Sequence, residues 1–177
     1  MSDHTVEATG PAAVGHWTLD PAHSHVSITS KALWGLMPVK GVFTRLSGSG
    51  DVAADGTAAG TLTIAAASID TRNAKRDDHL RGADFFDTAV HPDIVFTAHR
   101  LVPGAGGEVR ATGTLSVAGV EHPLEFTATA EHAGDTVTLT ARTTVDRGDF
   151  GLTWNNLGML VGRTRVTVTA RFTRAAA

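Results

Sequence analysis

VTLTARTTV, residues 137–145, alternates between largely apolar residues at odd positions and polar residues at even positions. Successive side chains of a β-strand point to opposite faces, so this period of two indicates a strand with one buried face. The same period recurs in residues 25–34, 39–44, 61–66, 94–99, 109–117, 124–130 and 165–172. About eight such strands predict an antiparallel sheet around one interior, either a closed up-and-down barrel or a two-layer sandwich.

Glycine-containing dipeptides separate the alternating runs and predict the turns between strands. They lie at Asp55-Gly56, residues 103–107, Gly119 and Gly134-Asp135. On composition, Gly48-Ser49-Gly50 is also interpreted as a hairpin turn. Connections this short favour strands that run antiparallel to their neighbours in sequence.

The segment SIDTRNAKRDDHLRGADFFDTAVHP, residues 68–92, interrupts this pattern. A charged cluster at residues 76–81 leads into the adjacent aromatics Phe85 and Phe86, and the segment ends at His91-Pro92, where proline biases the preceding residue away from helix. We interpret so long a connection as a lid, a plug or a site. Adjacent residues cannot face the same way on a strand or helix, so one phenylalanine is expected to plug the barrel and the other to meet a ligand.

The same segment resembles the central signature of the YceI-like family of polyisoprenoid-binding proteins. The residues that carry the resemblance are Thr71, Asn73, Arg76, Asp77, His79, Leu80, Asp84-Phe85-Phe86 and Pro92. Further matches follow in the expected order at residues 17–20, 23–24, 41–43, 68–71, 113–115, 119–120 and 147–151. The resemblance therefore extends over nearly the whole chain after its first residues.

The resemblance implies an all-β fold, an eight-stranded antiparallel up-and-down lipocalin-like barrel, with a short helical segment near Lys75 to Asp87 that closes one end. It implies a YceI-like lipid-binding domain over residues 16–177 and, as in the family, a homodimer. Residues 1–15, MSDHTVEATGPAAVG, form a flexible leader with neither the charged start nor the apolar run of a signal peptide. We therefore expect a cytoplasmic location and no transmembrane segment.

Composition narrows the classes of function. The 177 residues fit one domain, and 42% hydrophobic with 19% charged residues is ordinary for a globular protein. A net charge of -3 gives no reason to expect nucleic acid as a partner. The chain has no cysteine, which excludes disulfides and thiolate chemistry.

Many of the predicted inward positions carry small residues. They are Ala32, Gly41, Ala66, Ala98, Ala111, Gly113, Ala128, Ala130, Ala141 and Ala170. A barrel filled by its own side chains favours larger residues, so this pattern indicates either an apolar cavity or a flattened barrel in which alanine suffices. The resemblance favours the cavity.

Apolar side chains supply the predicted lipid contacts, because a long hydrocarbon is held by buried area rather than by directed hydrogen bonds. The alternative for any one aromatic is plain core packing. Residues 34–37 are apolar where a turn should be polar, and we interpret them as a lipid-access rim. The predicted lipid-binding residues are Ile28, Trp34, Phe43, Ile64, Leu80, Phe85, Phe86, Phe96, Leu115, Phe126, Phe150 and Trp154.

Two sets of residues invite a chemical interpretation. His23 and His25 lie two apart on a predicted strand and so point the same way, but no third and fourth zinc ligand accompanies them. The run 76–79, RDDH, fits an acid–base pair or, better, a short helix whose Asp77 or Asp78 pairs with a nearby arginine. We predict no catalytic residue, no metal, and no cofactor beyond a bound isoprenoid or quinone-type lipid.

Two classes of function remain. The first is a non-enzymatic protein that binds, stores or transports an isoprenoid lipid, and the alternative is an enzyme that uses the same cavity on a hydrophobic substrate. The predicted inward positions hold no polar cluster, which favours the first. Binding should then depend little on the head group or on salt, unless Arg72, Arg76 or Arg81 reaches the mouth.

Overall fold

The computed structural model describes residues 12–32, 37–152 and 161–176. The strands are β1 (Gly15–Leu19), β2 (His25–Ala32), β3 (Met37–Phe43), β4 (Leu46–Val52), β5 (Ala58–Ala65), β6 (Ile69–Asp70), β7 (Asp93–Pro103), β8 (Glu108–Val117), β9 (Val120–Ala133), β10 (Thr136–Asp146) and β11 (Val161–Arg174). The helices are α1 (Ala74–Arg81) and the 3₁₀-helices η1 (Pro21–His23), η2 (Ala66–Ser68), η3 (Ala105–Gly107) and η4 (Arg147–Phe150). None of these described helices is long and apolar enough to cross a membrane.

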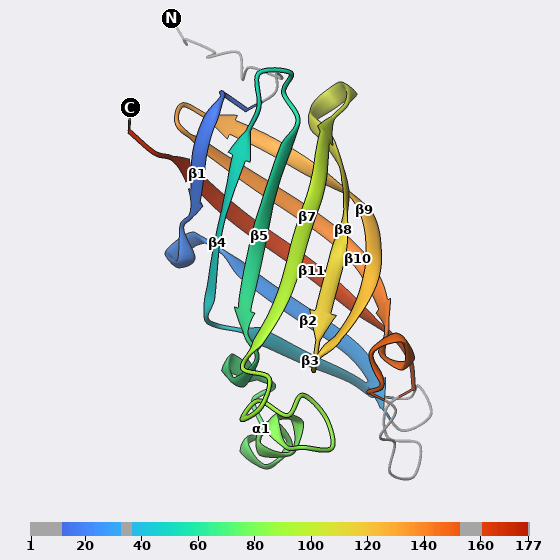
Figure 1. Ribbon diagram of the computed structural model, residues 1–177. Helices are drawn as coiled ribbons and strands as arrows, with labels where there is room; N and C mark the ends of the chain where they lie inside the picture. Colours follow the sequence, from blue (N-terminus) through green and yellow to red (C-terminus); the bar gives the residue numbers. More distant parts are fainter. Residues whose placement is uncertain (1–11, 33–36, 153–160, 177) are drawn as a thin grey trace, which may run out of the picture.

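The strands close into an antiparallel barrel (Figure 1). Within the described residues, β1, β4, β5, β7, β8, β9, β10 and β11 are neighbours in that order. β1 then pairs with β11, from Trp17 opposite Arg174 to Leu19 opposite Phe172, which completes a ring of eight strands. The predicted eight-stranded up-and-down barrel is confirmed, and the two-layer sandwich is excluded. Closure leaves the ring without an exposed edge.

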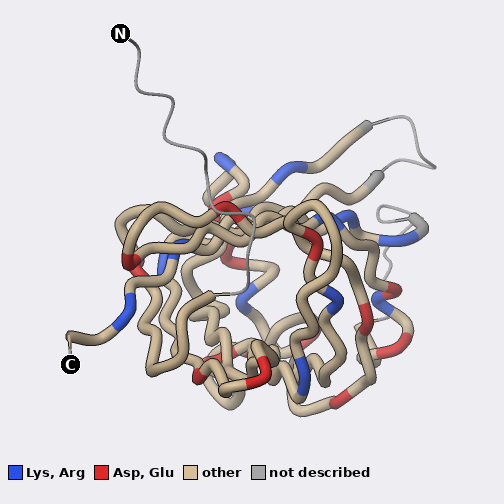
Figure 2. Tube along the Cα trace, turned by 90° about the horizontal axis from the view of Figure 1, so that it is seen from above, with Lys and Arg blue, Asp and Glu red and all other residues tan. Residues whose placement is uncertain are grey.

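The remaining strands lengthen the barrel toward α1. β11 pairs with β1 near its end and with β2 earlier along its length, while β3 pairs with β2 and β6 pairs with β3. Three strands of the barrel are therefore each interrupted once: β1 and β2 by η1, β3 and β4 by residues 44–45, and β5 and β6 by η2. Seen from above, the strands form a ring (Figure 2).

The predicted alternation is visible in the burial of β10. Val137 and Ala141 are buried, whereas Thr140, Arg142 and Thr144 on the other face are exposed. A pleated strand in a closed sheet presents one face to the interior and the other to solvent, which explains the period of two. The sequence pattern therefore assigns the inward face of this strand correctly.

The prediction of a hairpin turn at Gly48-Ser49-Gly50 is wrong, because these residues lie inside β4. A Cβ atom added at Gly48 would lie 2.7 Å from the carbonyl oxygen of Thr61, and one added at Gly50 would lie 2.9 Å from that of Ala59. The two glycines allow the backbones of β4 and β5 to approach closely. Close approach and a tight turn select the same residue type, so composition does not distinguish them.

Helix α1 is short because its sequence caps both ends. The Asn73 side chain accepts a hydrogen bond from the backbone N–H of Arg76 (3.0 Å) at the N-terminus. Gly82 ends the helix in an extended conformation, with its N–H donating to the carbonyl oxygen of His79. The helix therefore occupies only part of the range predicted for it, and the residues up to Asp87 form turns.

Arg81 ties α1 to the barrel. Its Nε donates to the carbonyl oxygen of Ala67 (2.9 Å) and its Nη2 to that of Ile69 (3.1 Å). Its Nη1 donates to Asp78 Oδ1 (3.2 Å), one of the pairings predicted for this helix. Leu80, on the same turn, is buried in the core. The segment that interrupts the strand pattern is thus a fixed closure at one end of the barrel.

Candidate functional site: a two-chambered apolar interior

Two cavities lie inside the barrel. The first, here called the turn-end cavity, has a volume of about 260 Å³ and reaches Gly56 and Gly107, in the turns opposite α1. The second, the helix-end cavity, has a volume of about 480 Å³ and lies against α1. The two share wall residues: Val26, Ile64, Leu115, Val145 and Val166. They are therefore consecutive chambers of one interior.

Small residues line the turn-end cavity, as the sequence predicts. Its wall includes Ala98, Ala111, Ala128, Ala141 and Ala170, which come from five different strands. Side chains this short cannot meet across the barrel, so a space remains along its axis. The interior is hollow, which decides between the cavity and the flattened barrel.

The structure places every described member of the predicted lipid-binding set on a cavity wall. Phe96 and Phe126 lie in the turn-end wall, with ring centroids 5.3 Å apart. Ile64 and Leu115 belong to both walls. The helix-end wall contains Ile28, Phe43, Leu80, Phe85, Phe86 and Phe150. Trp34 and Trp154 lie outside the described residues, as does most of the proposed access rim at 34–37. Contact of these residues with a lipid stays a prediction.

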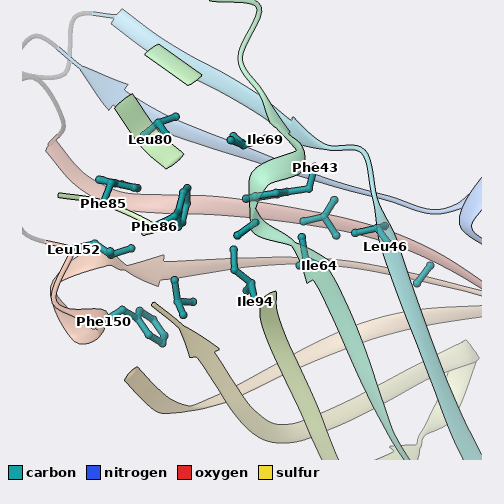
Figure 3. Packing of buried hydrophobic residues seen from close by; sticks show 14 of the residues in the cluster. Phe43, Leu46, Ile64, Ile69, Leu80, Phe85, Phe86, Ile94, Phe150 and Leu152 are labelled. Carbon is teal, nitrogen blue, oxygen red and sulfur yellow. The ribbon is translucent and has the colours of Figure 1, made fainter. Parts of the chain in front are cut away.

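Phe85 and Phe86 do not divide their roles as the sequence predicts. Each is 7% exposed, both line the helix-end cavity, and their rings meet edge to face at 4.7 Å. Both can face inward because they lie in a turn rather than on a helix or strand. Figure 3 shows them beside Leu80, with Phe43 of β3 nearby. Both phenylalanines therefore form the floor of this chamber.

The expectation that no polar cluster faces the interior is wrong. Arg147, Ser30 and Thr164 line the helix-end cavity, and the hydroxyl groups of Ser30 and Thr164 are hydrogen-bonded at 2.8 Å. Thr164 precedes Val166 of β11 by two residues, and Arg147 follows Val145 by two, just beyond the end of β10. The period that identifies the apolar wall could therefore have found these polar residues as well.

A second polar group lines the same cavity from the side of α1. Thr71 N–H and Oγ1 both donate to Asp77 Oδ1, at 3.0 and 2.5 Å, and both Thr71 and Asp77 are buried. Arg76 donates from Nε to Thr71 Oγ1 and from Nη2 to the Thr71 carbonyl oxygen, each at 2.9 Å. Lys75 and His79 also line the cavity. This network ties Thr71, in the loop before α1, to the helix.

Of the three arginines considered for head-group contact, only one lines a cavity. Arg76 does so, with its guanidinium partly engaged by Thr71. Arg81 is bonded to backbone carbonyl groups, as described above, and Arg72 is exposed. Arg147, which was not among these three, also lines the helix-end cavity.

The histidine pair is not arranged as predicted. His23 ends η1 and its Nδ1 lies 2.7 Å from Asp20 Oδ2, whereas His25 opens β2, so the two do not share one strand. The described residues contain no group of three or more His, Cys, Asp or Glu side chains placed to bind a metal ion. Asp20 itself caps η1, because its side chain accepts a hydrogen bond from the N–H of Ala22.

Comparison with known proteins identifies relatives of this chain. The chain matches the model of the YceI-like domain family over residues 17–173. A UPF0312 protein of Shewanella baltica (strain OS185) is 31% identical over 150 residues, which cover 80% of this chain and 78% of the relative. Protein YceI of Escherichia coli O157:H7 is 42% identical over 74 residues, covering 42% of this chain and 38% of the relative.

Solved structures show the same fold. BcnA of Burkholderia cenocepacia superposes with a TM-score of 0.78 at 22% identity, covering 86% of this chain and 98% of BcnA. A domain from Saccharophagus degradans, described as a polyisoprenoid binding domain implicated in plant cell wall breakdown, has a TM-score of 0.73 at 18% identity. That alignment covers 92% of this chain and all of the other. At these identities the similarity shows the fold.

Proposed function

The chain belongs to the YceI-like domain family, and we propose that it binds a long apolar isoprenoid lipid, of the polyprenyl or quinone type, within its barrel. It does so as a carrier or store, without chemistry of its own. The observation that carries this proposal is the hollow interior, whose two cavities share apolar wall residues. A long hydrocarbon gains most of its binding free energy by leaving water for such a surface.

The polar side chains of the interior support binding rather than catalysis. Thr71, Asp77 and Arg76 satisfy one another and fix a loop, and Ser30 bonds to Thr164. A general base must reach the proton that it abstracts, and hydroxyl groups occupied in this way hold structure instead. The structural similarity to a polyisoprenoid binding domain of another organism agrees with the class of ligand.

Native mass spectrometry after purification without detergent or organic solvent tests the proposal. We expect a fraction of the protein to carry a noncovalent apolar mass, which extraction with organic solvent removes and an added prenyl alcohol restores. Protein that arrives empty and takes up no prenyl alcohol would contradict it. Turnover of a hydrophobic substrate that is lost in His79→Ala or Asp77→Asn would favour the enzymatic alternative instead.

We also propose that the protein forms the homodimer that the family resemblance implies, and this is tested separately. Sedimentation velocity across a range of concentrations should give a dimer whose mass does not depend on the presence of the lipid. A monomer at all concentrations would contradict the proposed homodimer without affecting the carrier proposal.

A further inference from the structure

Arg147 brings a permanent charge to an apolar wall. It begins η4, directly after β10, and its Nε and Nη1 atoms are buried. Desolvation lowers its pKa, and the nearby charge of Asp146 partly offsets this. A guanidinium nevertheless keeps its proton in a protein. Asp146 is exposed, and its Oδ1 accepts a hydrogen bond from the N–H of Gly148.

The wall around Arg147 offers further polar atoms. β10 pairs with β11 so that Val145 lies opposite Thr164, and Thr164 is hydrogen-bonded to Ser30 of β2. Two adjacent strands, β11 and β2, thus carry polar inward residues at the level of Val145, and Arg147 lines the cavity from just beyond the end of β10.

The wall on the α1 side adds two more cations. Lys75 and Arg76 line the helix-end cavity, and the Nη1 group of Arg76 takes no part in its bonds to Thr71. Among its described lining residues, the helix-end cavity has Lys and Arg but no Asp or Glu. The turn-end cavity has the reverse: its lining includes Asp51 and Glu108 and, within the described chain, no Lys or Arg. The charged residues that line the two cavities therefore differ in sign between the two ends of the barrel, and Lys75, Asp51 and Glu108 among them are exposed.

We propose that the helix-end cavity is a subsite for an oxyanion head group, a carboxylate or a phosphate, which Arg147 binds together with Lys75 and Arg76. The hydrocarbon tail extends from there toward the turn-end cavity. This inference rests on the proposed function, because it presumes that an apolar tail occupies the barrel. A planar guanidinium fork suits both oxyanions, and charge-assisted hydrogen bonds to it are the strong ones.

Two matched pairs of ligands test the subsite: geranylgeranyl phosphate against geranylgeraniol, and palmitate against hexadecanol. Isothermal titration calorimetry gives the affinity ratio within each pair, so the tail contribution cancels. We expect the wild-type protein to prefer at least one anion over its alcohol by about ten- to a hundredfold, the range for a hydrogen bond to a charged group. A preference confined to one pair identifies the head group as phosphate or as carboxylate.

Arg147→Gln should abolish the preference and leave the affinity for the alcohols unchanged, and Arg147→Lys should retain part of it. The matched control is Arg142→Gln, because Arg142 lies on the outer face of β10, the strand that leads into Arg147, and is exposed. Equal affinity for anion and alcohol in the wild-type protein, or a preference that survives Arg147→Gln, would overturn the subsite. The carrier function would stand in either case. Failure of all four ligands to bind would instead contradict the proposed function.

Discussion

At Ala128 a single methyl group separates the backbone of β9 from the turn-end cavity. We expect Ala128→Phe to fill part of this chamber and to weaken binding of long lipids. Some overpacking accompanies it and typically costs about 1–3 kcal/mol of stability. Ala111 lies directly opposite Phe126 and is 1% exposed, so Ala111→Phe should destabilise the fold more.

Thr127→Phe is the matched control for Ala128→Phe, because Thr127 precedes Ala128 on the same strand and is exposed on the outer face. Thermal melts and titrations with a prenyl alcohol separate the two effects. Full ligand uptake by a folded Ala128→Phe protein would show that the turn-end cavity does not receive the tail.

Two surface carboxylates, half-buried Asp20 and exposed Asp55, give the fold a dependence on acid pH. The hydrogen bond with His23 is the main cause that lowers the pKa of Asp20 below its ordinary value of 3.8, and the bond from the Thr57 hydroxyl does the same for Asp55. Because the folded pKa is the lower one, the stabilisation is present above about pH 4 and is lost as the pH falls through the lowered pKa.

Asp20→Asn and Asp55→Asn should therefore each lower the melting temperature at neutral pH. The difference from the wild-type protein should shrink as the pH is taken below the lowered pKa values. Melting curves at a series of pH values check this. A deficit that stays constant down to the most acid pH would show that the carboxylate charge is not its source.

Single residues also show what the sequence can predict. The inward position of Ala128 follows from a local period of two, which the chain dictates wherever one face is buried. Arg147 lies two residues after inward-facing Val145, just beyond β10, but the inward positions were expected to be apolar, and Arg147 was therefore missed. The arrangement of His23 and His25 was missed because Asp20 and Pro21 start a 3₁₀ turn between two strands. That turn depends on where neighbouring strands end.

At the scale of one element, the Thr71–Asp77 contact controls the closure at α1. Both hydrogen bonds from Thr71 end on one oxygen of a buried carboxylate. Asp77→Ala would leave these donors buried without an acceptor, and such a loss costs about 1–3 kcal/mol. Asp77→Asn keeps an acceptor oxygen and should cost less.

Asp78→Ala is the control for Asp77→Ala. Asp78 is exposed on the same helix, and its ion pair with Arg81 is of a kind worth about 0–1 kcal/mol. Hydrogen exchange should show faster opening of α1 in Asp77→Ala, while β8 and β9 keep most of their protection. Equal effects of the two alanine variants would show that the buried contact does not hold the closure.

Prediction succeeds for whole elements where one local rule decides. Most strands of the barrel follow from alternation, although β1 and β4 were not among the predicted runs, and the position of α1 follows from the segment that breaks the pattern. The sequence alone does not show that Gly48 and Gly50 allow β4 and β5 to approach closely, because this depends on the partner strand. Likewise, Phe85 and Phe86 both face inward only because the chain turns there, after Gly82 has ended the helix.

At the scale of the molecule, the ring of eight strands makes one long interior and the closure at α1 gives it two different ends. The alternation could predict the ring only together with the family resemblance, since a sandwich has the same period. It could not predict the volumes of the chambers, because these depend on how side chains from opposite strands meet. The length of this interior should therefore limit how much of a hydrocarbon tail can be buried in it.

Affinity should therefore rise with ligand length and then level off. Each methylene group buried contributes about 0.8 kcal/mol, so prenyl alcohols of increasing length should bind more tightly until both chambers are full. Alcohols lack the anionic head group, so their series reports the tail alone. Calorimetric titration of the series with the wild-type and Ala128→Phe proteins checks this, and the variant should reach its plateau at a shorter chain. An affinity independent of length from the shortest alcohol onward would mean that the tail does not enter the barrel. A plateau at the same length in both proteins would mean that it stops in the helix-end cavity.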